Sequence, residues 1–130
     1  MPCLTTHLRA AMNPPTNALF DEMAACASRS RDATAIGVQA FARLLTLAER
    51  QDSGQIIRVA KFIAATYNGQ AFPLDLYELR AVDIAISDDM LACLDALRWA
   101  KADLHTLVPE GDARVRRVIR KAGLRWPSEG

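Results

Sequence analysis

Residues 52–101 read DSGQIIRVAKFIAATYNGQAFPLDLYELRAVDIAISDDMLACLDALRWAK, and this stretch decides the fold. Two longer segments within it place apolar residues at helical spacing. Neither helix can bury its apolar stripe alone, so the two must pack against each other or against a third helix. The first stripe comprises Ile56, Ala60, Ile63, Ala64 and Tyr67, and the second comprises Ile86, Met90, Cys93, Leu94 and Leu97.

The ends of these helices carry recognisable signals. Asp52 and Ser53 have side-chain oxygens that can cap the first helix, and Asn68-Gly69 is expected to end it in the left-handed conformation. The Asp75–Glu78 spacing is that of a capping box, which predicts a short helix through Leu79. The second long helix is then predicted to run from near Asp83 to Lys101.

Two further helices are predicted before this stretch and one after it. Asn17 begins a helix through Ala27, residues 28–31 (SRSR) break the pattern, and a second helix runs from Asp32 or Thr34 to Arg50. Gly37 weakens the first turn of that helix, because glycine costs about 1 kcal/mol relative to alanine. Asp112 caps a final helix over 113–122, which Gly123 ends. The core faces comprise Ile36, Ala40, Phe41, Leu44, Leu45 and Ala48 in the first of these regions, and Val115, Val118, Ile119 and Ala122 in the last.

These patterns predict an all-α protein. No window alternates β-branched and polar residues, so no sheet is expected. An apolar content of 51% over 130 residues suits one compact, single-domain bundle of about five helices. We expect residues 1–16 to be a loose N-terminal arm, 17–126 to be the single helical domain and 127–130 to be a frayed tail.

Composition argues against several classes of protein. A net charge of +1 is too small for wholesale electrostatic binding to DNA or a membrane. The apolar runs are too short to span a bilayer, and the N-terminus lacks the pattern of a secretory signal. Cys3, Cys26 and Cys93 have no motif spacing, which predicts free thiols in a cytoplasmic protein.

The chain also lacks the usual signatures of catalysis. Asp83 and Asp88 are five residues apart and share a helix face poorly, and no histidine motif for zinc is present. A nucleophilic pair of Cys93 and His105 is disfavoured because Cys93 lies in an apolar stripe, where a thiol stays inert. There is no glycine-rich phosphate loop. We therefore predict no catalytic residue, no metal, no cofactor and no enzymatic activity.

The last predicted helix carries the sharpest functional feature, a set of cations on its outer side. These groups could contact phosphates, engage an acidic protein surface or simply solvate the helix and offset its C-terminal dipole. The preceding turn is too long for a typical helix-turn-helix reader of DNA. The candidate contact residues are Arg114, Arg116, Arg117, Arg120, Lys121 and Arg125.

Charge is divided unevenly along the chain. Residues 75–95 contain six acids and one arginine, whereas residues 96–130 contain eight basic groups and four acids. The two parts could neutralise each other within the fold by ordinary ion pairing, or dock head to tail between copies. Asp88, Asp89 and Trp99 form a second candidate partner surface, although a core role for Trp99 is favoured.

The motifs D-S-G-Q at 52–55, R-V-A-K-F at 58–62 and V-D-I-A-I-S-D-D-M-L at 82–91 resemble an uncharacterised bacterial domain family. The resemblance covers Leu44 to about Leu97 and does not include the basic C-terminus. It implies a small accessory protein of integrative elements, plasmids or phage-like regions, with no assigned activity. The leading hypothesis is a non-enzymatic interaction protein that docks on a partner by charge complementarity. It would act either as an inhibitor of a host defence complex, of the anti-CRISPR kind, or as a regulator of element maintenance. The alternative is a DNA- or RNA-binding regulator that uses residues 113–122.

Overall fold

The computed structural model describes residues 16–99 and 102–127. Every regular element in these two ranges is helical, which confirms the all-α prediction, with four α-helices rather than about five. The α-helices are α2 (Thr16–Arg50), α3 (Gly54–Tyr67), α4 (Ile84–Trp99) and α5 (Gly111–Lys121), joined by the 3-10 helices η1 (Leu76–Arg80) and η2 (Leu104–Leu107).

Helix α2 replaces the two N-terminal helices predicted from the sequence, so the expected break at residues 28–31 is wrong. These residues contain no proline or glycine, and serine costs only a few tenths of a kcal/mol inside a helix. The Thr34 hydroxyl donates to the Ser30 carbonyl oxygen (2.7 Å). The Ser30 hydroxyl donates to the backbone carbonyl of Trp99 (3.2 Å), which ties this part of α2 to the end of α4.

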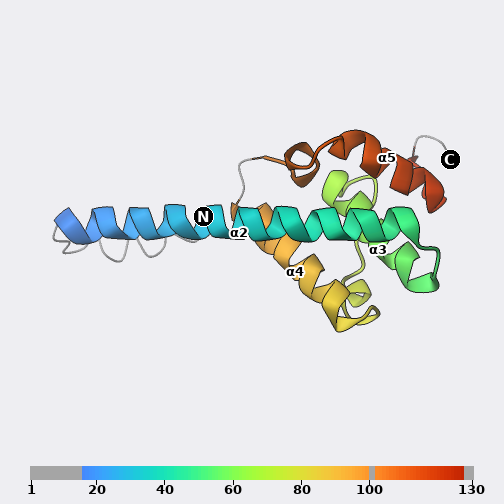
Figure 1. Cartoon of the computed structure of the whole chain (residues 1–130), viewed down its shortest axis with the longest axis horizontal. Helices are drawn as coiled ribbons and strands as arrows, with labels where there is room; N and C mark the ends of the chain where they lie inside the picture. The colour runs from blue at the N-terminus through green and yellow to red at the C-terminus, as the bar shows by residue number, and fades with distance from the viewer. Residues whose placement is uncertain (1–15, 100–101, 128–130) are drawn as a thin grey trace.

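Figure 1 shows α2 running the length of the molecule, with its N-terminal half extending beyond the other helices. Helix α4 crosses it obliquely, and α5 and the N-terminal end of α4 lie on opposite sides of it. The first buried residue of α2 is Ala33, and the core is built between the second half of α2 and the remaining helices. The part of α2 before Ala33 therefore contributes little to the core.

The α2–α4 crossing is the most extensive contact between helices. Gly37 lies at its centre, where an added Cβ would collide with the Cβ of Ala96 and lie 2.9 Å from the Ala92 carbonyl oxygen. The Cys93 thiol donates to the Gly37 carbonyl oxygen (3.8 Å). Gly37 thus marks a close approach between two helices and not a weak helical turn.

The predicted stripes of α3, α4 and α5 are all buried or half-buried, as expected. Val59 and Phe62 are buried as well, so the inner face of α3 is wider than the predicted stripe. Ile36 is the exception among the predicted core residues, because its side chain is exposed. It precedes Gly37 by one position, which places it about 100° around the helix from the crossing.

Several helix ends use different chemistry from that predicted. Ser53 is the N-cap of α3 but makes no side-chain capping bond. Asn68 is extended (φ −153°) and not left-handed; its Oδ1 accepts from the backbone N–H of Gln70 and Ala71. Helix α5 begins at Gly111, so Asp112 lies in its first turn and does not cap it.

Gly123 ends α5, as predicted, and the structure shows that it does so in the left-handed conformation (φ 73°). The N–H of Leu124 donates to the Ile119 carbonyl (3.1 Å) and that of Gly123 to the Arg120 carbonyl (3.0 Å), the pair of bonds of a Schellman motif. Leu124 and Trp126 then pack against the core.

The corner between α3 and α4 is held by charge. Asp75 accepts from the N–H of Tyr77 (3.0 Å), which caps η1. Glu78 does not complete the predicted capping box, because its carboxylate is buried and accepts from Arg58 Nη1 (2.9 Å). Residues 104–107 form the 3-10 turn η2, which belongs to the turn before the last helix. The predicted N-terminal arm, apart from Thr16, and residues 128–130 of the predicted tail lie outside the described residues.

Candidate interaction surface

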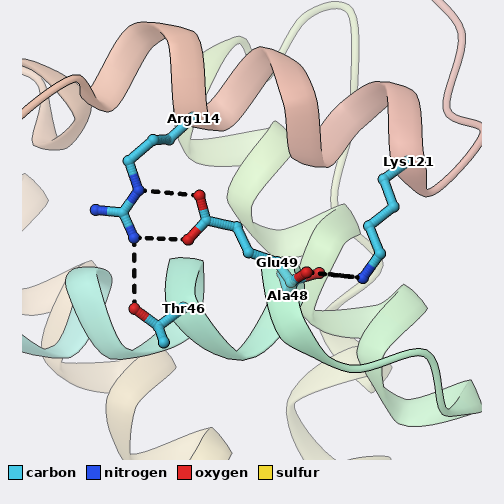
Figure 2. Close-up of polar contacts among 5 residues, drawn as sticks. All are labelled: Thr46, Ala48, Glu49, Arg114 and Lys121. Atoms are coloured by element: carbon cyan, nitrogen blue, oxygen red, sulfur yellow. Dashed lines mark hydrogen bonds and ion pairs between the residues drawn. The ribbon is translucent and has the colours of Figure 1, made fainter.

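Helix α5 turns its apolar face inward and its cations outward, but three of the six predicted binding residues are used inside the protein. Arg114 is the first of them. Its Nε donates to Oε2 of Glu49 (3.0 Å) and its Nη2 to Oε1 of Glu49 (2.7 Å). Figure 2 shows this two-pronged contact and the longer bond from the same guanidinium to the Thr46 hydroxyl (3.4 Å).

Lys121 is the second cation that the fold uses. Its ammonium donates to the backbone carbonyl oxygens of Ala48 (2.8 Å) and Glu49 (3.3 Å), near which Figure 2 shows it. It also donates to the carbonyl oxygen of Gln51 (2.7 Å), so it closes the C-terminal end of α2. Positive charge is favourable there because the last carbonyls of a helix have no partner within it. The ammonium also pairs with Asp52 (3.1 Å), the residue predicted to cap α3.

Arg116 is the third, and it belongs to a cluster that the sequence did not suggest. Its Nε donates to Oδ2 of Asp112 (3.1 Å), and its guanidinium carbon lies 5.8 Å from the centre of the Tyr67 ring. The Tyr67 hydroxyl donates to the other oxygen of Asp112, and the His105 ring packs edge-on against Tyr67. Asp112 and Arg116 are four positions apart on α5, but Tyr67 comes from α3 and His105 from η2, so spacing along the sequence could not have grouped all four.

The other three cations are available to a partner. Arg117, Arg120 and Arg125 are exposed and form no ion pair within the described part of the chain. Arg117 and Arg120 are one turn apart on the outer side of α5, and Arg125 follows the Gly123 cap. These three arginines are called the basic face below.

The second predicted set does not form one surface. Asp88 is exposed, whereas Asp89 accepts from Arg43 through both carboxylate oxygens (2.7 and 3.2 Å). Trp99 is only 8% exposed, with the guanidinium groups of Arg29 and Arg98 over its ring. The core role favoured for Trp99 is therefore confirmed, and Asp88 alone of this set is open to a partner.

The titratable groups of the core are poorly suited to nucleophilic chemistry. Burial raises the pKa of the Cys93 thiol to about 12, and its hydrogen bond goes to Gly37 and not to His105. The hydrogen bond to Asp112 raises the pKa of Tyr67.

Cys26 is disulfide-bonded, so the expectation of three free thiols is wrong for this residue. Among the described residues, no group of histidine, cysteine and acid side chains could hold a metal ion.

A small cleft lies between the N-terminal end of α3 and α5. Its floor is apolar and includes Ile56, Ala60 and Val118, and its rim includes Asp52 and Lys121. Because these two charged groups already bind each other, the rim does not offer an unpaired acid and base to a substrate. None of the helices in the described ranges is long and apolar enough to cross a membrane.

Residues 38–123 match the model of a family of unknown function, DUF7673. The chain belongs to this family. The DUF7673 match begins at the α2–α4 crossing and ends at the glycine that closes α5. It confirms the resemblance to an uncharacterised domain family, but the expectation that the basic C-terminal helix lies outside the family is wrong. No curated protein and no solved structure matches the chain.

Proposed function

We propose that this protein is a non-enzymatic accessory protein that binds an acidic surface of another protein through its basic face. One observation carries the proposal: Arg117, Arg120 and Arg125 have no ion pair within the described chain, whereas Arg114, Arg116 and Lys121 each hold a carboxylate. A partner can therefore engage the first three without breaking a contact that positions α5.

Arginine suits this role because its planar guanidinium can bind a carboxylate through two parallel hydrogen bonds. Rim charges of this kind chiefly set the association rate and the choice of partner. A protein partner is favoured over nucleic acid because only three arginines in residues 111–127 are free of ion pairs and carboxylates flank them. Asp112 lies on the same helix, and Asp52 is exposed beside Lys121.

The proposed setting is the cytoplasm of a bacterium, where the protein would serve an integrative element, plasmid or phage-like region. There it would inhibit a host defence complex by occupying its surface, in the manner of an anti-CRISPR protein. This part of the proposal is supported by the sequence resemblance and not by the geometry of the basic face.

The test is capture of host proteins on the immobilised full-length chain, with Arg117→Ala/Arg120→Ala as the variant. Arg31→Ala/Arg80→Ala is the matched control, since it removes two exposed cations that also lack an ion pair in the described chain. We expect the first variant to lose the captured protein and the control to retain it. Equal capture by the wild type, the Arg117→Ala/Arg120→Ala variant and the control variant would contradict the proposal.

The second candidate function is DNA or RNA binding, which the run of exposed arginines on one helix favours. Phosphate contacts release counterions, so the logarithm of the binding constant should fall linearly with the logarithm of salt concentration. Arg117→Ala/Arg120→Ala should then reduce that slope by about 2, roughly one unit per lost phosphate contact. Retention of nucleic acid that is unchanged in this variant would exclude the basic face as its binding site.

A further inference from the structure

A second exposed surface lies on η1 and the outer side of α4. Leu76 is 72% exposed, Tyr77 65% and Ile84 76%, and Leu91 is also exposed. Helix α4 uses its opposite face, which includes Met90, for the core. We call the four exposed residues the apolar corner. Ile84 and Leu91 are seven positions apart and so lie on one side of α4, and large exposed apolar side chains that lie together mark interaction sites.

The carboxylates around the apolar corner are not neutralised within the described chain. Asp75 and Asp83 each form hydrogen bonds with uncharged groups, the Tyr77 backbone and Gln55. Asp88 forms no ion pair in these ranges. The other acids of this region are paired with cations of α2, α3 or α4, not with α5: Asp89 with Arg43, Glu78 with Arg58, and Asp95 with Arg98.

Three unpaired carboxylates on one side of the molecule therefore match three unpaired arginines on the other. No ion pair in the described chain joins η1 or α4 to α5. Figure 1 places α5 and the N-terminal end of α4 on opposite sides of α2, so one molecule cannot bring the two surfaces together. A second copy can.

We propose that copies of this chain associate head to tail, with the basic face of one molecule on the apolar corner of the next. The inference rests on the proposed function, because it names a partner for the same basic face. Arg117 and Arg120 of one copy would pair with the free carboxylates of the next, which are those of Asp75, Asp83 and Asp88. The side chains of Ile84 and Tyr77 would then be shielded from water by α5 of the adjoining copy. Because the two surfaces differ, the contact is heterologous and does not close in a dimer; it extends into longer species as concentration rises.

Light scattering coupled to size-exclusion chromatography tests this on the full-length protein. We expect the wild-type mass to rise with concentration at low salt and to fall towards the monomer at high salt, because salt screens the ion pairs. Ile84→Arg/Asp88→Arg should block the apolar corner, and Arg117→Glu/Arg120→Glu should block the basic face. Each variant alone should be monomeric, but each keeps one intact surface. An equimolar mixture should therefore form dimers and nothing larger.

Asp32→Arg and Arg31→Glu on α2 are the charge-reversal controls and should associate like the wild type. Circular dichroism would show that the variants keep their helices. A monomer at every concentration overturns the inference, and so does association that only one of the two blocking variants abolishes. If the wild type stays monomeric while Arg117→Ala/Arg120→Ala still loses a captured host protein, the self-association fails and the proposed function stands.

Discussion

At the scale of single residues, Arg114 and Lys121 decide which cations face outward. Both reach from α5 to the last turns of α2, where one binds the Glu49 side chain and the other binds backbone carbonyls. With these two contacts made, the rotation of α5 is set and Arg117 and Arg120 point to solvent. Two cations that look like binding residues in the sequence therefore position the others.

Arg114→Ala should destabilise the protein by about 1–2 kcal/mol, because it breaks a half-buried, charge-assisted pair. The hydrogen bonds from Arg114 lower the pKa of the Glu49 carboxyl below its usual value of 4.5. A carboxyl group whose pKa is lower in the folded state than in the unfolded state stabilises the protein at pH values above its usual pKa. This stabilisation is lost as the pH falls through the pKa of the folded state. Denaturant unfolding should therefore show the full difference from the wild type at neutral pH and a shrinking one below about pH 4.5.

Arg120→Ala is the control for this measurement, since Arg120 is exposed and forms no ion pair within the described chain, and it should change stability by less than about 0.5 kcal/mol. A difference between wild type and Arg114→Ala that does not vary with pH would show that the pair with Glu49 is not its source.

At the scale of elements, the α2–α4 crossing determines the shape of the core. The two helices approach closely because Gly37 has no Cβ and Ala96 has only a methyl group. The same approach brings the Cys93 thiol to the Gly37 carbonyl and buries it. A residue chosen for helix propensity alone would be alanine at position 37, so packing overrides propensity here.

Gly37→Ala should destabilise the protein by about 1–3 kcal/mol, the usual cost of overpacking, even though alanine gains about 1 kcal/mol in helix propensity. Thermal unfolding measures the change. Gly54→Ala is the matched control, because an added Cβ at that helical position meets nothing within 4 Å and should be neutral or stabilising. Equal effects of the two substitutions would contradict the role assigned to the crossing.

At the scale of the whole molecule, the described residues form a compact body and a projecting half-helix. The DUF7673 match covers residues 38–123, which is the body. None of residues 17–32 is buried. The first half of α2 is held to the body near Ser30 and Arg29, both of which contact Trp99.

Cys93 is a free thiol, so the disulfide of Cys26 does not join the first half of α2 to the body. Removal of residues 1–27 should therefore lower the melting temperature by less than about 5 °C, equivalent to about 1 kcal/mol for a domain of this size. Removal of residues 1–36 should lower the melting temperature clearly more, because it deletes the buried Ala33 and the Ser30–Trp99 hydrogen bond. Calorimetry on the two shortened chains makes the comparison. A large loss from the shorter deletion would show that the projecting half-helix stabilises the body.

The sequence by itself determined the all-α class and the inner faces of α3, α4 and α5, because apolar spacing along a helix is a local property. It also located the left-handed glycine that closes α5. It did not determine that α2 is continuous, because serine at positions 28 and 30 fits a helix or a break, and the bond from Ser30 to Trp99 is made only in the folded protein. The same division between sequence and tertiary structure applies to the candidate interaction surface. Charge spacing identified the cations of α5, but which three are free depends on Glu49, Asp112 and the end of α2, and only folding brings these groups to α5.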